Sequence, residues 1–212
     1  VDFLPPYKPP YPLDPAYGPI TKGQHIAPSL IGPEQRKIVD VAMKRAKGVI
    51  VEAWEDYARY VGRRYSPFIE ASYMDDAEIV LIAMGAYAKD AKYVAGKLRK
   101  EGIKAGVMRL RYFRPFPAEE LRKALKGIKA VGALDFSYSF GSADSGGVFF
   151  NELRSTLYEL GSRPLLMDFM FTGGREPSVA HFEQAIKLLH RSAEKGEVEK
   201  RVWWLTLRGE DA

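Results

Sequence analysis

Eight residues in three loops carry the groups best suited to bind an anion or to contact another chain. An arginine can hold a carboxylate or a phosphate through two parallel hydrogen bonds. The backbone N–H groups of a loop rich in glycine and serine can also hold an anion where the loop leads into a helix. Each of the three loops follows a predicted strand. The candidates are Arg114, Ser139, Ser142, Gly146, Gly147, Gly173, Gly174 and Arg175.

These loops also have structural interpretations. Arg114 can equally pair with a carboxylate across an interface. The loop at 137–147 lacks the spacing of a phosphate-binding P-loop, and it is also typical of an ordinary connection whose following helix is capped by Asp144 or Ser145. Gly85, after the first strand of the predicted sheet, is not followed by the other glycines of a dinucleotide-binding fingerprint. It therefore predicts a tight turn between strand and helix.

No set of side chains in the sequence forms a self-sufficient active site. The three histidines, His25, His181 and His190, lack the spacing of metal ligands, and no G-x-S-x-G nucleophile elbow is present. The acidic pair Asp75 and Asp76 precedes a strand, at the end of a parallel sheet that does not bind ligands. Cysteine is absent, which excludes disulfides, cysteine-held iron–sulfur clusters and cysteine nucleophiles in this chain. We therefore predict no catalytic, cofactor-binding or metal-binding residue.

Composition indicates an ordinary globular protein. The 212 residues are 46% hydrophobic, and the net charge of +5 arises from interspersed charges of both signs. This pattern argues against nucleic-acid binding. No apolar run reaches the roughly 20 residues that span a bilayer, and no export signal is seen, so we expect a cytoplasmic protein that does not bind membranes. A single Asn beside 28% charged residues favours a thermophilic source.

The first 74 residues differ from the rest. Nine of the fourteen prolines lie within residues 1–33, which predicts an extended strap, either a semi-rigid linker or a segment packed on a neighbouring surface. A helical pattern of apolar residues begins at Glu34 and runs to about Tyr65, so residues 34–74 are predicted to be a long helix and a connection. This helix is expected to pack along its own domain or against another chain.

Strand and helix patterns alternate from residue 75 to about 200. Such alternation predicts an α/β fold with an open, mostly parallel sheet and helices on both faces. Residues 201–212 are predicted to be an aromatic tail, which either forms a last edge strand or contacts a partner. The expected strands are 79–84, 105–110, 130–134 and 165–169, and the expected helices are 88–100, 118–125, 147–160 and 179–193.

The order of these motifs resembles one known family. It is similar to the transketolase carboxy-terminal-like domain of the α subunit of pyruvate:ferredoxin and related 2-oxoacid:ferredoxin oxidoreductases. The resemblance covers essentially the whole chain, including the proline-rich strap and the long helix. The segments that carry it are 76–85, the string Arg111-Tyr112-Phe113-Arg114-Pro115-Phe116-Pro117, 130–135, the serine–glycine loop and Gly173-Gly174-Arg175.

The resemblance implies a structural and assembly domain that is inactive alone. The complete enzyme of this family converts a 2-oxoacid, here expected to be pyruvate, to an acyl-CoA and reduces ferredoxin. Thiamine diphosphate, Mg²⁺, iron–sulfur clusters and coenzyme A would be used by the complex but not bound by this chain alone. The expected partners are the thiamine-binding and iron–sulfur subunits or domains, and ferredoxin through the complex.

Two positions depart from the family pattern, and two other functions stay open. The family commonly has Asp-Arg where this chain has Asp135-Phe136. It commonly has Gly-Gly-Arg-Asp where this chain has Gly173-Gly174-Arg175-Glu176. One alternative is an independent module that binds an anion through Gly85 and the loop at 139–147. The other is the equivalent domain of a transketolase or a 2-oxoacid dehydrogenase.

Overall fold

The computed structural model describes residues 4–20, 28–171 and 173–208. By their internal contacts the residues form two compact units, Val1–Ala42 and Met43–Ala212. Each unit is described by itself. Residues 1–3 and 21–27 of the predicted strap, which include His25, and residues 209–212 of the predicted tail lie outside the described residues.

The proline-rich segment of the first unit is extended along most of its described length. Its one helical element is a short 3-10 helix, η1 (Pro15–Tyr17), where the Asp14 side chain accepts a hydrogen bond from Ala16 N at 2.9 Å. Leu4, Tyr7 and Leu13 are exposed within this unit. The extended conformation follows from proline, which lacks a backbone donor and fixes φ.

The long helix α1 (Pro28–Val61) is confirmed, but its predicted ends are wrong. The helix begins at Pro28 rather than Glu34, because proline suits the first helical position, where the N–H has no intrahelical partner. Pro33 lies inside the helix and costs only the hydrogen bond of one early residue. The helix ends at Val61 rather than Tyr65, because Gly62 adopts a left-handed conformation with φ +70° and donates to Ala58 O.

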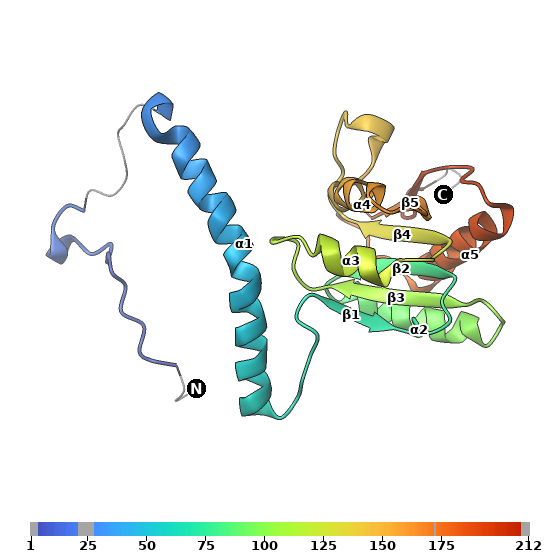
Figure 1. Cartoon of the computed structure of the whole chain (residues 1–212), viewed down its shortest axis with the longest axis horizontal. Coiled ribbons are helices and arrows are strands. Elements are labelled where there is room, and N and C mark those ends of the chain that lie inside the picture. The colour runs from blue at the N-terminus through green and yellow to red at the C-terminus, as the bar shows by residue number, and fades with distance from the viewer. Residues whose placement is uncertain (1–3, 21–27, 172, 209–212) are drawn as a thin grey trace. The chain divides into compact units, whose positions relative to one another are not determined.

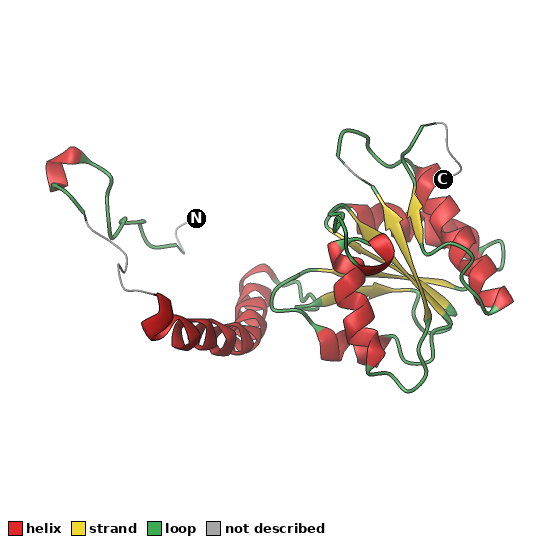
Figure 2. Ribbon diagram, turned by 90° about the horizontal axis from the view of Figure 1, so that it is seen from above, coloured by secondary structure: helices red, strands yellow, loops and turns green. Residues whose placement is uncertain are grey.

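The second unit contains one six-stranded sheet with helices on both faces, as Figures 1 and 2 show. The strand order is β1-β3-β2-β4-β5-β6, and all pairs are parallel except β1 with β3. The predicted open, mostly parallel α/β class is therefore confirmed. The strands are β1 (Ile69–Ser72), β2 (Ile79–Met84), β3 (Ala105–Leu110), β4 (Ala130–Asp135), β5 (Leu165–Met170) and β6 (Val202–Trp204). The helices after α1 are α2 (Tyr87–Arg99), α3 (Ala118–Ala124), α4 (Val148–Tyr158) and α5 (Val179–Lys195).

The two edge strands are where the sheet departs from the predicted elements. The sequence pattern did not indicate β1, because four residues give little periodicity and the strand is defined by pairing with β3, from Ile69 opposite Leu110 to Ser72 opposite Val107. The aromatic tail contains an edge strand, β6, which is one of the two predicted possibilities. It ends at Trp204, whereas the apolar run in the sequence continues to residue 207.

The core lies in two layers, one on each face of the sheet. Helices α2 and α5 cover one face, where Leu81, Phe169 and Leu189 are buried. Helices α3 and α4 cover the other face with Val80, Met108 and Phe149. Burial on both faces explains why β2, β3 and β4 read as continuous apolar runs.

Arg111 joins the carboxyl-terminal half of α1 to the sheet. Its guanidinium lies 5.1 and 5.3 Å from the ring centroids of Trp54 and Tyr65 and donates to Glu70 Oε2 at 2.6 Å. Trp54 Nε1 donates to the hydroxyl of Tyr112 at 3.0 Å. The arginine-rich connection after β3 therefore serves partly to hold α1 against its own domain, one of the two predicted settings of this helix.

We expect Gly132→Ala to destabilise the second unit by about 2 kcal/mol, because overpacking a tight core costs roughly 1–3 kcal/mol. A Cβ at this position of β4 would lie 2.7 Å from the Phe169 ring and 2.8 Å from Leu189 Cδ1. Urea unfolding measures the change. Gly161→Ala is the matched control, since a Cβ there meets no atom within 4 Å. Equal unfolding free energies for the two variants would contradict this packing.

Candidate functional site: the carboxyl edge of the sheet

Ligands of open parallel sheets bind where the strand order reverses, beyond the carboxyl ends of the strands. In this sheet the reversal lies between β2 and β4, since the chain passes from β2 to β3 on one side and continues from β4 to β5 on the other. The turn after β2 is tight, with Gly85 at φ +64° and α2 beginning at Tyr87. The predicted tight turn is confirmed.

Aromatic rings pack together at this reversal point. The ring of Tyr87 lies 4.7 Å from that of Phe136, and Phe171 lies 5.4 Å from Phe136 and 6.4 Å from Tyr87. The Tyr87 hydroxyl donates to Glu176 Oε2 at 2.6 Å, and this bond raises the pKa of Tyr87. Phe136 and Glu176, the two residues that depart from the resembled family pattern, therefore both contact Tyr87. These side chains lie at the end of the sheet where a ligand of such folds commonly sits.

Two buried aspartates hold the loop between β4 and α4. Asp135 and Asp168 are 1% and 0% exposed. Asp135 accepts from Ser137 N through Oδ1 at 3.1 Å and from Phe150 N through Oδ2 at 3.0 Å. Asp168 Oδ2 accepts from Gly147 N at 2.7 Å. The amino end of α4 is thus capped by carboxylates that are distant in sequence, and the helix has no side-chain cap from its own N-cap residue, Gly147.

The predicted cap at Asp144 or Ser145 is therefore wrong. These residues lie in a separate 3-10 turn, η2 (Ala143–Ser145), and α4 begins only after Gly147. Asp135 and Asp168 were not among the predicted site residues. The available signal was a carboxylate within an otherwise apolar strand, since aspartate is almost never fully buried without a partner.

Burial raises the pKa of both aspartates. For Asp168 desolvation is the main cause, opposed by the bond from Gly147 and reinforced by the charge of Asp135, and its pKa rises to about 7. The pKa of Asp135 is also raised by burial, against the effect of several backbone N–H bonds. Asp168 Oδ1 is buried without a hydrogen-bond partner among the described residues. A neutral carboxyl is more easily accommodated there than a carboxylate.

The candidate residues of this loop contribute to its internal structure. A Cβ at Gly147 would lie 2.1 Å from Asp135 Oδ2, and a Cβ at Gly146 would lie 2.2 Å from the Phe150 ring, so both positions exclude larger residues. Ser139 N donates to Gly146 O at 3.1 Å, and Asn151 Nδ2 lies 3.5 Å from Ser142 Oγ. The N–H of Gly147 already donates to Asp168 Oδ2, so an external anion would have to displace that carboxylate.

The other two candidate loops are joined to the same edge. Arg114 Nη2 pairs with Glu152 of α4, and Arg114 Nη1 donates to Phe113 O at 2.9 Å. Arg175 Nη1 donates to Thr206 O at 2.7 Å. Gly173, Gly174 and Arg175 line a cavity of about 390 Å³ together with Thr206 and Leu207. Each arginine thus already has a partner within the chain.

An exposed aromatic group lies on the loop between β4 and α4. Phe140 is 88% exposed, and its ring packs edge-on against Tyr138 at 5.0 Å. Tyr138 in turn lies 4.8 Å from Trp204 of β6. The loop projects beyond the sheet in Figure 1. Trp204, Tyr138 and Phe140 thus form a row of ring contacts that ends in an exposed ring at this edge.

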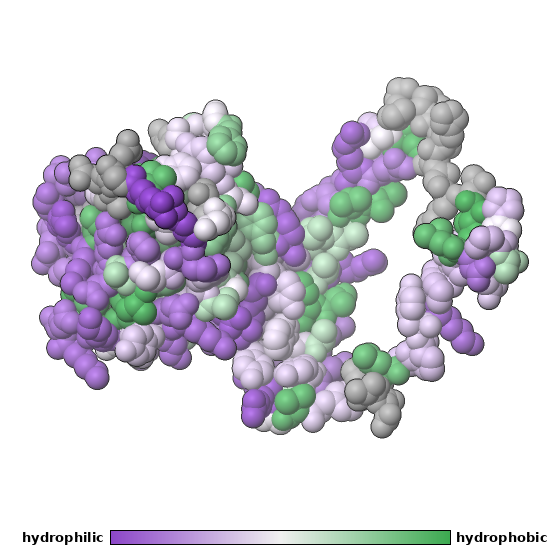
Figure 3. Space-filling model, turned by 180° about the vertical axis from the view of Figure 1, so that it is seen from behind, coloured by the Kyte–Doolittle hydropathy of each residue, from purple (hydrophilic) through white to green (hydrophobic). Residues whose placement is uncertain are grey.

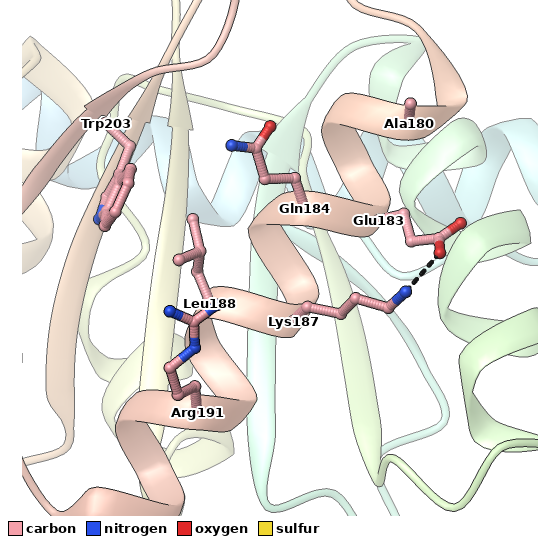
Figure 4. Close-up of a pocket in the computed structure, with 7 residues that line it drawn as sticks. All are labelled: Ala180, Glu183, Gln184, Lys187, Leu188, Arg191 and Trp203. Atoms are coloured by element: carbon pink, nitrogen blue, oxygen red, sulfur yellow. Dashed lines mark hydrogen bonds and ion pairs between the residues drawn. The ribbon is translucent and has the colours of Figure 1, made fainter. Parts of the chain in front are cut away.

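A wide groove lies along α5. It has a volume of about 600 Å³ and is lined by α5 and by Trp203 of β6, as Figure 4 shows. Within it Lys187 donates to Glu183 at 2.6 Å, and Lys97 donates to the same carboxylate at 3.0 Å. These two lysines lower the pKa of Glu183. The groove therefore carries charges of both signs.

The two described histidines, His181 and His190, contact other residues in or next to α5. Ser178 is the N-cap of α5, and its N–H donates to His181 Nδ1 at 2.8 Å. His190 lies 3.5 Å from Glu194 on the next turn of the helix. Within residues 4–20, 28–171 and 173–208 no cluster of three metal-binding side chains occurs, and no helix there is long and apolar enough to cross a membrane.

The fold and this edge define an open α/β domain whose own aromatic rings pack together at the reversal point. Comparison with known families identifies it more closely. Residues 77–182, half of the chain, match the pyruvate:ferredoxin oxidoreductase core domain II, and the chain belongs to this family. The resemblance derived from the sequence is thereby confirmed.

The curated relatives are subunits of two kinds of oxidoreductase. The chain is 35% identical to ketoisovalerate oxidoreductase subunit VorA of Pyrococcus horikoshii over 208 residues, 98% of this chain and 52% of the relative. It is 36% identical to pyruvate synthase subunit PorA of the same organism over 211 residues, 99% and 52% of the two chains. PorA of Thermotoga maritima is 34% identical over 87% of this chain. The chain spans about half the length of the curated relatives it matches.

Two solved structures are similar at a lower level. A split-gene transketolase covers 66% of this chain and 44% of its own, with a TM-score of 0.40 and 19% identity. The α chain of a probable 2-oxoacid ferredoxin oxidoreductase from Thermoplasma acidophilum covers 58% of this chain and 97% of its own, with a TM-score of 0.32 and 18% identity. The α/β class rests on the strand order itself.

The two buried aspartates are expected to respond oppositely to replacement by asparagine. Both oxygens of Asp135 accept N–H bonds, so Asp135→Asn points an amide donor at a backbone donor and should cost about 1–3 kcal/mol. Asp168 uses one oxygen only, so Asp168→Asn keeps the bond from Gly147 and should be nearly neutral or stabilising at pH 8. Urea unfolding of the two variants provides the comparison. Equal destabilisation would contradict the assigned bonds.

The stability of the wild-type chain should also fall between about pH 4 and pH 7 through Asp168. Its folded-state pKa of about 7 lies above the ordinary 3.8, so the folded chain binds more protons than the unfolded chain in this window. From pH 5 to pH 8 the loss is on the order of 2 kcal/mol, since one pKa unit corresponds to about 1.4 kcal/mol. The unfolding free energy of the Asp168→Asn variant should lack this dependence on pH. Glu78, whose pKa Lys129 and Lys104 lower to about 2, does not titrate in the range. Parallel pH profiles for wild type and variant would refute the expectation.

Proposed function

We propose that this chain is the core domain II part of the α subunit of a 2-oxoacid:ferredoxin oxidoreductase, and that it serves assembly rather than chemistry. The complete complex would oxidatively decarboxylate a 2-oxoacid to an acyl-CoA and reduce ferredoxin. The observation that carries the proposal is the family match together with VorA and PorA relatives along nearly the whole chain. A cytoplasmic location agrees with this role.

The cofactors of the complex are assigned to its other parts. The sequence contains no cysteine to hold an iron–sulfur cluster. At the reversal point of the sheet, the rings of Tyr87, Phe136 and Phe171 pack against one another. The proposal therefore has thiamine diphosphate, Mg²⁺, the clusters and coenzyme A bound by partner subunits or domains.

Two surfaces are suited to contact those partners. The first is the loop that carries Phe140, together with the neighbouring candidate residues Arg114, Ser139–Gly147 and Gly173–Arg175. The second is the outer side of α1, where Val49, Tyr57 and Tyr60 are 57%, 45% and 73% exposed. Figure 3 shows hydrophobic residues along this helix. Helix α1 thus packs against its own domain on one side and offers an apolar side to another chain.

The two alternative functions are less well supported. An anion-binding module using the loop at 139–147 would need backbone donors, but Asp135 and Asp168 already accept from Phe150 and Gly147. A transketolase or 2-oxoacid dehydrogenase domain would agree with the α/β class, yet the relatives that match nearly the whole chain are VorA and PorA subunits.

Co-assembly tests the function directly. The chain is expressed with the thiamine-binding and iron–sulfur subunits of its host, and size-exclusion chromatography follows the mixture. We expect co-elution and 2-oxoacid-dependent ferredoxin reduction, measured with pyruvate and with ketoisovalerate in turn. A chain that always elutes alone, with no activity in the mixture, would refute the proposal. The preferred 2-oxoacid follows from the two rates, with pyruvate as our expectation.

Phe140→Ser is expected to weaken co-assembly at least about ten-fold, because truncating a central aromatic contact commonly costs more than 1–2 kcal/mol. The dissociation constant, measured by surface plasmon resonance with the partner subunits immobilised, reports the change. Tyr93→Ser is the matched control, since Tyr93 is an aromatic residue of α2 that is 68% exposed and away from the carboxyl edge. Equal effects of the two substitutions on the dissociation constant would show that the loop is not part of the interface.

A further inference from the structure

A second cavity lies at the opposite edge of the sheet, where the parallel strands begin. It has a volume of about 270 Å³ and is lined by the end of α4, the start of β5 and the segment before β6. Three arginines line it: Arg154, Arg163 and Arg201. This cavity is remote from the carboxyl edge, because it sits at the amino ends of the strands whose other ends carry the loops described above.

The charged residues that line this cavity are all arginines. No aspartate or glutamate is among its lining residues, in contrast to the groove on α5, where Glu183 pairs with Lys187. Among the described residues Arg163 and Arg201 make no ion pair with a carboxylate. The guanidiniums of Arg163 and Arg201 line one small cavity and repel one another, and a bound anion would offset that repulsion.

The protein positions the guanidiniums of Arg163 and Arg201 while leaving most of their donors unused. Arg163 Nε donates to Tyr158 O at 3.0 Å, and its guanidinium lies 4.4 Å from the centroid of the Tyr158 ring. Arg201 Nη1 lies 3.4 Å from Leu166 O. Arginine has five N–H donors in a fixed planar arrangement. Each of these two side chains is therefore held by one bond to a backbone carbonyl, with Nη donors left for a ligand.

The floor of the cavity is apolar. Leu157 and Leu166 are 4% and 7% exposed, and Val198 also lines the cavity. A cavity of about 270 Å³ is near the lower limit of small-molecule sites, which span about 300–1,000 Å³. The combination suits a compact ligand with an anionic group at the arginines and a small apolar group on the leucines.

We propose that this cavity binds a phosphate monoester with a small apolar organic group. Phosphate oxygens can accept hydrogen bonds from two guanidiniums at once, and a phosphate monoester carries more negative charge than a single carboxylate. Arg163 also complements the negative end of α4 through Tyr158 O. That role uses one of its five donors and does not involve Arg201. The proposal is independent of the oxidoreductase assignment, since it rests only on this cavity.

Isothermal titration calorimetry of the full chain with phenyl phosphate tests the proposal. We expect one saturable site with a dissociation constant below about 1 mM, weaker binding of inorganic phosphate and no binding of phenol. Arg201→Gln and Arg163→Gln should each weaken phenyl phosphate binding at least about ten-fold, because each removes charge-assisted hydrogen bonds. If Arg163→Gln unfolds through loss of its bond to Tyr158 O, Arg201→Gln decides.

The control is Arg191→Gln, which removes an exposed arginine from the groove on α5 and should leave phenyl phosphate binding unchanged. A chain that gives no saturable heat with phenyl phosphate at several times about 1 mM overturns the proposal. Equal weakening by Arg191→Gln and Arg201→Gln also overturns it, because general electrostatic attraction would then account for the binding.

Discussion

The arrangement of the carboxyl edge depends on two buried carboxyl groups that have no cationic partner among the described residues. A buried carboxyl is tolerated only where hydrogen bonds replace those it made to water. Asp135 and Asp168 obtain them from backbone N–H groups of Ser137, Gly147 and Phe150. This requirement fixes the start of α4 and the base of the loop before it. It also restricts position 147 to glycine, since a Cβ would collide with Asp135.

The same constraint bears on function. An open parallel sheet usually presents free helix N-termini to a ligand at its carboxyl edge. Here the chain uses those donors itself, and the rings of Tyr87, Phe136 and Phe171 pack over the reversal point. What remains at this edge is a projecting loop with an exposed Phe140 and the cavity lined by Gly173, Gly174 and Arg175. The proposed contact with a neighbouring subunit rests on this loop.

Prediction from the sequence was accurate for elements that are long or buried on both faces. The strands Ile79–Met84 and Ala105–Leu110 have the bounds that their apolar runs indicate. The site was predicted less completely. Arg114, Gly147 and Arg175 were found through their residue types and their places after strands. Their partners Glu152, Asp168 and Thr206 were not, because pairs separated by 21 to 38 residues leave no local pattern.

The sequence by itself determined the α/β class, the proline-rich strap, the long helix and the absence of cysteine chemistry. These follow from local periodicity, proline geometry and composition, which need no knowledge of distant contacts. Only the tertiary structure decided that β1 and β6 close the two edges, that Gly62 ends α1, and that buried aspartates rather than local residues cap α4. It also brought Arg154, Arg163 and Arg201 to one cavity. Each of these features depends on residues that meet only when the sheet has formed.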